Sequence, residues 1–193
     1  EVVDLVQPDG DTEGYGPFSV NLWQYPFTTA RYYGIPAADY FGEEHLALLR
    51  GQLEMYKSAG GNVLTTTIVE DPWNSQTQDS YPSMVKWTKK TDGTFAYDYT
   101  YFDKYVELGL EVGVATWVDC FSMVPWSNRI IYYDEATGQN VTSTPSPGSA
   151  AWKALWNPFL ESFVAHVEEK GWFDFTRIAL DERSLSDLQA CLD

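Results

Sequence analysis

The chain has 193 residues, enough for one globular domain with a sizeable core, and its 44% hydrophobic and 21% charged residues are ordinary for a folded protein. Its 28 acidic and 12 basic residues give a net charge of -16, and such a surface repels nucleic acid and anionic membranes without penalising neutral ligands. Aromatic residues reach 16%, which suits both core packing and flat platforms for the apolar faces of sugars.

Metal, cofactor and membrane signals are absent from the sequence. Cys120 and Cys191 lie far apart in the sequence, and no Cys/His spacing is typical of a zinc site. We expect both cysteines to be buried apolar thiols. No stretch has the apolar length of a membrane span, and no glycine-rich nucleotide motif or phosphate loop is present. We therefore expect no metal, no cofactor and no transmembrane helix. The chain does not begin with a signal sequence, and the residues alone assign no cellular compartment.

Strand-like and helix-like segments alternate along the chain. Residues 18–24 are β-rich and stop before Pro26, which predicts a first strand, and the β-branched run 62–69 predicts a second. A hairpin is predicted from 130–133 back to 141, turning about Gly138. Further strands are predicted at 113–118 and 176–180, and helical spacing of apolar residues predicts helices over 43–59, 101–110, 150–170 and 184–192, the last capped by Ser184 or Ser186.

The predicted order βαβαβαβα indicates a parallel α/β sheet, either doubly wound or a barrel. Long loops after strands and short loops after helices favour a barrel, whose active face is built from the strand-to-helix loops. We therefore predict that residues 1–193 form one domain, the first four βα units of a TIM-type (β/α)8 barrel. A half barrel exposes sheet edges and an apolar face, so we expect self-association or a second chain that supplies the complementing barrel half.

Polar and aromatic side chains gather where the predicted strands end. They are Trp23 and Gln24 after the first, Glu70, Asp71, Trp73 and Gln76 after the second, Asp119, Met123 and Trp126 after the third, and Asp181 and Glu182 after the fourth. Carboxylates, amides and tryptophans without histidine fit carbohydrate chemistry better than phosphoryl transfer. The predicted substrate contacts are Trp73, Gln76, Tyr81 and Trp126. For each of these four side chains, a role in packing the loop is an equal alternative. Trp23 and Gln24 are predicted to shape the mouth of the site.

Asp181 and Glu182 are the candidate catalytic residues. Successive side chains of a strand point to opposite faces, so this pair reaches one ligand only if the backbone turns at the strand end. The two carboxylates could then divide the work. Glu182 would protonate the leaving oxygen, while Asp181 would orient a substrate 2-acetamido group that attacks the anomeric carbon. On the triplet 181–183 alone, a solvated Asp-Glu-Arg ion-pair cluster is the favoured alternative.

Ordered segments throughout the chain resemble the catalytic domain of glycoside hydrolase family 123, the β-N-acetylgalactosaminidases. The segments are 22–26, 30–32, 44–45, 71–76, 81–85, 95–99, 102–106, 122–126, 170–172 and 178–183. The resemblance implies a (β/α)8 barrel and retaining, substrate-assisted removal of terminal β-linked N-acetylgalactosamine from glycans such as those of glycosphingolipids. It also implies that Asp181 orients the acetamido group, that Glu182 is the acid/base, and that the protein is extracellular or periplasmic. Asn21 and Ser184 depart from the Asp and Pro expected there.

Two other functions stay open from the sequence. One is a retaining glycosidase whose nucleophile lies outside this chain. The other is a non-catalytic glycan-binding or assembly fragment that needs the missing half of the barrel.

Overall fold

The computed structural model describes residues 19–192, so Phe18 of the predicted first strand lies outside the described part. The helices are α1 (Pro26–Tyr32), α2 (Glu43–Ser58), α3 (Thr100–Val112), α4 (Ala150–Glu169) and α5 (Leu185–Leu192), with 3-10 turns η1 (Ala37–Asp39) and η2 (Phe173–Phe175). The strands are β1 (Val63–Thr67), β2 (Lys86–Lys89), β3 (Phe95–Asp98), β4 (Trp117–Phe121), β5 (Ile130–Asp134), β6 (Gln139–Ser143) and β7 (Thr176–Ala179). None of these helices is long and apolar enough to cross a membrane.

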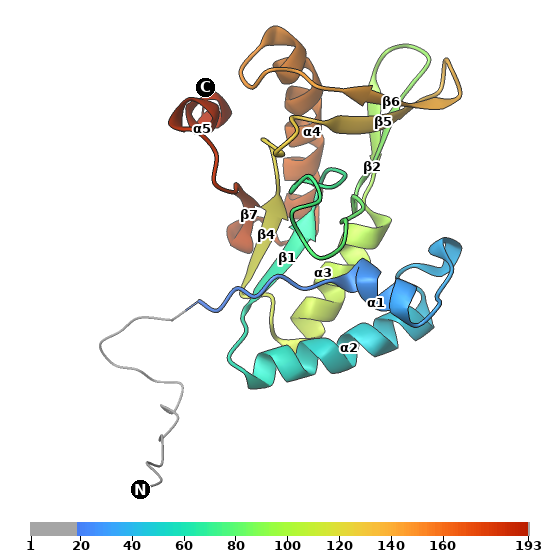
Figure 1. Cartoon of the computed structure of the whole chain (residues 1–193), viewed down its shortest axis with the longest axis vertical. Coiled ribbons are helices and arrows are strands. Elements are labelled where there is room, and N and C mark those ends of the chain that lie inside the picture. The colour runs from blue at the N-terminus through green and yellow to red at the C-terminus, as the bar shows by residue number, and fades with distance from the viewer. Residues whose placement is uncertain (1–18, 193) are drawn as a thin grey trace, which may run out of the picture.

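The strands form two small sheets (Figure 1). The first sheet is parallel, with the order β1-β4-β7, and its register aligns Thr65 with Asp119 and Asp119 with Arg177. The second sheet is mixed, with the order β3-β2-β5-β6, and consists of two hairpins joined by the parallel pair β2 and β5. Both hairpins come from the long connections that follow β1 and β4.

The predicted half barrel is therefore wrong, although the α/β class is right. The structure has a three-stranded parallel sheet beside a four-stranded mixed one, and the described residues close no barrel. Residues 19–24 form no strand. Side-chain hydrogen bonds tie them to β1 instead: Gln24 Oε1 accepts from the Thr65 backbone N–H at 2.9 Å, and Gln24 Nε2 donates to Val63 O at 3.3 Å. An amide side chain thus occupies backbone groups that a neighbouring strand would use.

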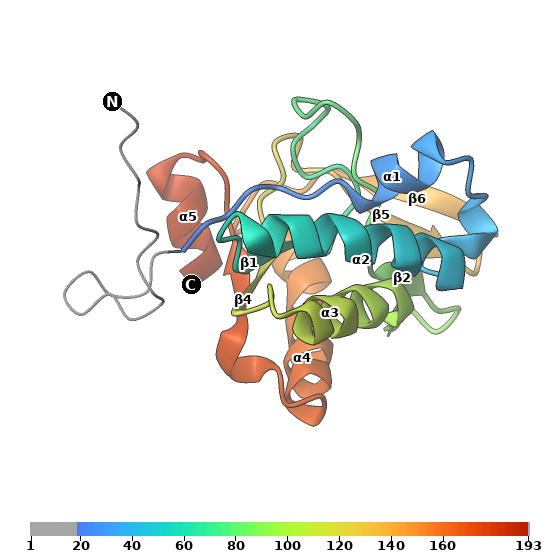
Figure 2. The ribbon, with the colours of Figure 1, turned by 90° about the horizontal axis from the view of Figure 1, so that it is seen from below.

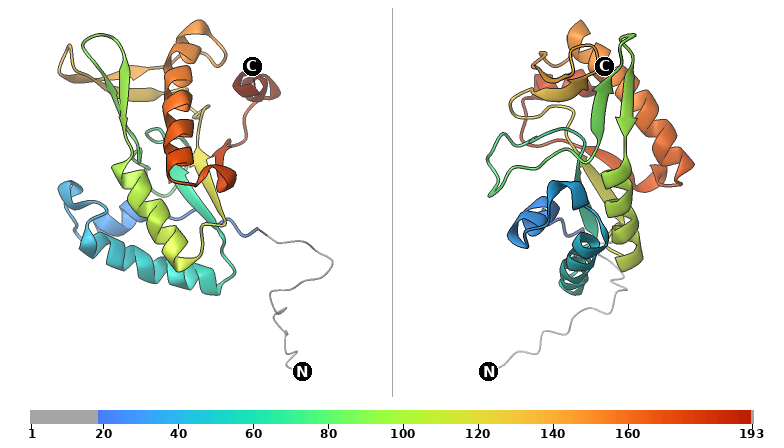
Figure 3. Two further views of the ribbon diagram at one scale, coloured as in Figure 1. Left: turned by 180° about the vertical axis from the view of Figure 1, so that it is seen from behind. Right: turned by 90° about the vertical axis from the view of Figure 1, so that its right-hand side faces the viewer.

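Helices cover one face of the parallel sheet, and residues 19–25 cross the other (Figures 1 and 3). On the helical side, Gly109 of α3 meets Leu64 so closely that an added Cβ would lie 2.8 Å from Leu64 Cδ2. α2 runs beside α3 (Figure 2). The second sheet packs on α4 through the rings of Trp87 and Phe159, stacked with centroids 4.5 Å apart. One continuous core thus joins both sheets to the helices.

Local predictions fare better than the architecture. The four predicted helices are confirmed, and Ser184 caps α5 because its Oγ accepts from the Asp187 backbone N–H at 3.1 Å. The hairpin about Gly138 is confirmed as β5 and β6. The third predicted strand begins later, at Trp117, because Gly113 ends α3 in the left-handed region at φ 84°. The β2 and β3 hairpin falls in a segment predicted as a loop.

Candidate active site

An aromatic cluster fills the space at the carboxyl ends of β1 and β4. Trp73 and Tyr81, both from the connection after β1, are buried with Phe121 at the end of β4. The Trp73 ring centroid lies 4.8 Å from those of both Tyr81 and Phe121. Trp23 packs on Trp73 at 4.5 Å and stays 36% exposed. Trp23 is thus the most exposed of these four rings.

Trp126 links this end of the sheet to the candidate catalytic pair. Its indole Nε1 donates a hydrogen bond to Asp181 Oδ2 at 2.6 Å, and its ring packs against the aromatic cluster. Asp181 follows the last residue of β7 by two positions, and its side chain is half-buried. The bond fixes the direction of the Asp181 carboxylate and takes up one of its two oxygens, so Oδ1 remains for another donor.

Arg183 holds the Trp126 loop in place from the other side. Its guanidinium donates to Trp126 O at 3.0 Å and to Asn128 Oδ1 at 3.1 Å, and it pairs with Asp187 at 3.2 Å. Its Cζ also lies 5.2 Å from the Trp126 ring centroid, within cation–π range. The Arg183 side chain is only 10% exposed. The triplet 181–183 is therefore not a solvated ion-pair cluster, because its arginine binds a neighbouring loop.

An ion pair between a buried aspartate and a half-buried arginine connects the segments after β1 and β4. Asp71, only 5% exposed, accepts from Arg129 Nη2 at 3.2 Å and from the Ser75 backbone N–H at 3.1 Å. Beside this pair, the backbone N–H of Trp126 donates to the backbone oxygen of Pro72 at 2.9 Å. Strained backbone gathers here too: left-handed φ angles occur at Asp71, Asn74, Ser75 and Asn128. Strain of this kind concentrates at functional sites, and here it accompanies a cross-linked pair of loops.

Glu70 lines a separate cavity of about 360 Å³ between the connection after β1 and the second sheet. Burial raises the pKa of the Glu70 carboxyl above its ordinary value, although Ser83 N–H donates to its Oε2 at 3.0 Å and opposes the rise. Glu70 is thus a half-buried acid close to Asp71, outside the Asp181 contact network.

Glu182 differs from its neighbour. Its side chain is exposed, and it makes no hydrogen bond or ion pair with any of residues 19–192. A positioned Asp181 beside a free Glu182 allows the two carboxylates to act differently: one can orient a ligand group, and the other can exchange a proton with it.

The other predicted site residues lie in several environments. Gln76 is exposed on the connection after β1, whereas Trp73 and Tyr81 are buried and present no open face in this structure. Asp119 lies within β4 rather than after it, where it binds Arg177 Nε at 2.7 Å and Asn21 Nδ2 at 2.9 Å. The substrate contacts proposed from the sequence, Trp73, Gln76, Tyr81 and Trp126, stay predictions.

Sequence reasoning missed the residues that hold the site together. Met123, grouped with the site by its position, is 5% exposed and belongs to the core. Arg129 and the loop contacts of Arg183 were not predicted, because their partners lie more than fifty residues away in the chain. The available signal was an arginine in each polar loop of an otherwise acidic chain. Within residues 19–192, no group of three or more His, Cys, Asp or Glu side chains is placed to hold a metal ion.

Adjacent carboxylates beside tryptophans at the carboxyl ends of parallel strands fit the class of the glycoside hydrolases. The family model for the catalytic domain of glycoside hydrolase 123 matches residues 23–193, and the chain belongs to this family. A family 123 glycoside hydrolase from Clostridium perfringens, whose structure was analysed for glycolipid glycan hydrolysis, is similar with a TM-score of 0.85 and 47% identity. That match covers 88% of this chain and 30% of the other, so the chain spans less than a third of that relative. No curated protein matches the chain.

Proposed function

We propose that this chain carries the catalytic carboxylates of a glycoside hydrolase that removes terminal β-linked N-acetylgalactosamine from glycans. Asp181 orients the 2-acetamido group, whose carbonyl oxygen attacks the anomeric carbon to form an oxazoline. Glu182 protonates the leaving oxygen and then accepts a proton from the water that opens the oxazoline. Two displacements retain the anomeric configuration.

The observation that carries this proposal is the 2.6 Å hydrogen bond from Trp126 Nε1 to Asp181 Oδ2. An orienting carboxylate must keep one direction while the acetamido group reacts, and the indole donor and the Arg183 contacts behind it supply that constraint. Glu182, exposed and unpaired among residues 19–192, is free to meet a leaving oxygen. Family membership supports glycoside hydrolysis as the reaction.

The test is hydrolysis of an aryl β-N-acetylgalactosaminide by the chain, compared with Glu182→Gln and Asp181→Asn, together with inhibition by a thiazoline that mimics the oxazoline. Substrate assistance requires thiazoline inhibition of the wild type and loss of turnover in both variants. Turnover that resists thiazoline would instead indicate an enzyme nucleophile. Sugar binding without any turnover would favour the second candidate, a glycan-binding fragment. The reason to consider it is that the match covers only 30% of the Clostridium perfringens protein.

A further inference from the structure

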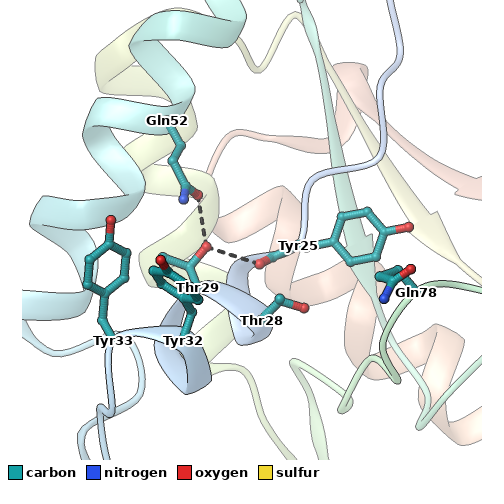
Figure 4. A pocket seen from close by; sticks show the side chains of 7 residues that line it. All are labelled: Tyr25, Thr28, Thr29, Tyr32, Tyr33, Gln52 and Gln78. Carbon is teal, nitrogen blue, oxygen red and sulfur yellow. Dashed lines mark hydrogen bonds between the residues drawn. The ribbon is translucent and has the colours of Figure 1, made fainter.

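A further pocket lies on the α1 and α2 side of the connection after β1. It has a volume of about 530 Å³, and Figure 4 shows the side chains that line it. They belong to Tyr25, Thr28, Thr29, Tyr32, Tyr33, Gln52 and Gln78, and we call this site the tyrosine groove. None of them hydrogen-bonds to Asp181.

Two exposed aromatic rings flank the tyrosine groove. Tyr32 is 81% exposed and Tyr33 is 56% exposed, and their rings meet edge to face with centroids 5.0 Å apart. Neither ring contributes to the core of the described residues. Adjacent tyrosines left open in this way offer flat apolar faces with polar edges, the surface that aromatic residues commonly present to ligands.

Polar groups on neighbouring elements converge on the same space. The Thr29 hydroxyl lies 2.9 Å from Gln52 Oε1 and 3.2 Å from Tyr25 O. Figure 4 shows that this contact takes one end of the Gln52 amide and leaves the other end turned toward Tyr33. Gln78 places a second, exposed amide across the groove. Amides can both donate to and accept from hydroxyl groups.

The lining of the tyrosine groove is uncharged, although the chain has a net charge of -16. The charged chain neighbours of Tyr32 and Gln78 satisfy each other: Arg31 Nε donates to Asp79 Oδ2 at 2.9 Å, and the Thr28 hydroxyl donates to the same oxygen at 2.7 Å. A charged ligand would find no counter-charge in this lining. A neutral ligand with apolar faces and many hydroxyl groups matches the rings and amides together.

We propose that the tyrosine groove is a second carbohydrate-binding site, which takes neutral hexose rings of an oligosaccharide away from Asp181 and Glu182. A row of packed aromatic rings links the tyrosine groove to the Trp126 end of the carboxylate site. The Tyr25 ring at the groove lies 5.0 Å from Tyr81, and Tyr81 packs on Trp73 in the cluster beside Trp126. A longer glycan therefore has sugar-type surfaces on both sides of the connection after β1. Binding in the groove does not depend on turnover at the carboxylate pair.

The experiment titrates the full chain with a neutral trisaccharide of hexoses, and with the tetrasaccharide that carries an added β-N-acetylgalactosamine, observed by ¹H–¹⁵N NMR. We expect the trisaccharide to shift the amides of Tyr32, Tyr33 and Gln52 without shifting those of Trp126 and Glu182. Tyr32→Ala/Tyr33→Ala should weaken trisaccharide binding about tenfold or more, because exposed aromatic anchors dominate such contacts. Gln52→Ala should weaken it as well, whereas Tyr33→Phe, which keeps the ring, should bind nearly as the wild type does.

Tyr133→Ala removes a tyrosine of comparable exposure, 44%, from β5 outside the groove and is the matched control. Circular dichroism of each variant confirms that it is folded. Unchanged trisaccharide affinity in the double variant, or shifts confined to Trp126 and Glu182, overturns the proposal. Turnover of an aryl glycoside, measured in parallel, reports on the carboxylate pair alone. Failure of the tyrosine groove is thereby distinguishable from failure of the proposed hydrolase activity.

Discussion

The indole nitrogen of Trp126 and the carboxylate of Asp181 lie 2.6 Å apart, and their hydrogen bond joins the loop after β4 to the end of β7. A charge-assisted bond of this length is among the stronger contacts that a protein makes. It holds Asp181 in one direction while Glu182, the next residue, stays exposed. Two chemically similar neighbours are thus given different environments by one tryptophan.

We predict that Trp126→Phe lowers kcat for an aryl β-N-acetylgalactosaminide by about 100-fold, since small misplacement of a positioning group has effects of that order. Phenylalanine keeps part of the ring contact with the aromatic cluster but cannot donate to Asp181. Binding of the thiazoline inhibitor should weaken in the same variant, because the acetamido group would lose its oriented partner.

The matched control is Trp152→Phe, which also removes an indole donor, in this case one that binds Met123 O at 3.3 Å in the core. This control should lower thermal stability while leaving turnover per folded molecule unchanged. If both variants lost activity equally, the role assigned to the Trp126 donor would be wrong.

Arg183 should be sensitive to replacement by lysine. Lysine cannot contact Trp126 O, Asn128 and Asp187 together in the geometry of a guanidinium. We predict that Arg183→Lys lowers the free energy of unfolding by about 1–3 kcal/mol, because the half-buried partners of Arg183 lose their donors. Urea denaturation measures this change. Arg50→Lys, at an exposed ion pair with Glu111, should change the free energy by about 0.5 kcal/mol or less. Equal effects at both positions would contradict a holding role for Arg183.

The helices were predictable because their signal is local. Apolar residues at helical spacing between 150 and 170 specify the buried stripe of α4, and Trp152 and Trp156 lie in the core as that spacing predicts. The architecture depends on partners far away in the chain. Residues 19–24 have strand-like composition, but the Gln24 side chain binds the backbone of β1 in place of a strand. Composition cannot show which group will occupy an edge.

The candidate site was predictable to the same extent. The position of Asp181 after a β-rich run, and of Trp126 in a polar loop, placed both at the carboxyl ends of strands, where the structure joins them. The partnership of Asp71 with Arg129 spans 58 residues and has no local signal. Burial also decides which aromatic rings are open. Trp73 is 1% exposed although its loop is polar, and no pattern in residues 70–85 indicates that.

Glu70 gives the stability of the protein a predictable dependence on pH. Burial raises its pKa in the folded state above the ordinary value of 4.5, so the folded state holds the proton more tightly than the unfolded chain does. The stability associated with protonated Glu70 is therefore complete below 4.5 and is lost as the pH rises through the folded-state pKa. Glu70→Gln removes this loss, and its amide oxygen can still accept from Ser83.

We expect the free energy of unfolding of Glu70→Gln, relative to the wild type, to rise as the pH increases above the ordinary carboxyl pKa of 4.5, as measured by urea denaturation. Glu54→Gln, at an exposed position on α2, should show no such trend. A difference that stays constant or falls with pH would show that Glu70 does not hold its proton in the folded state.

The outer edge of the parallel sheet leads to a prediction about association. Among the described strands, β7 pairs only with β4, so its other edge has no strand beside it. Phe173, 50% exposed, and Val164, 37% exposed, line a small apolar cavity together with Ile178 of β7. Unpaired edges with nearby apolar surface promote pairing with another chain. We expect sedimentation equilibrium to give a mass above the 21.9 kDa of one chain. Phe173→Lys should shift the equilibrium toward the monomer, whereas Met55→Lys, at a 71% exposed position on α2, should not. A wild-type chain that remains monomeric at high concentration would exclude association through this edge.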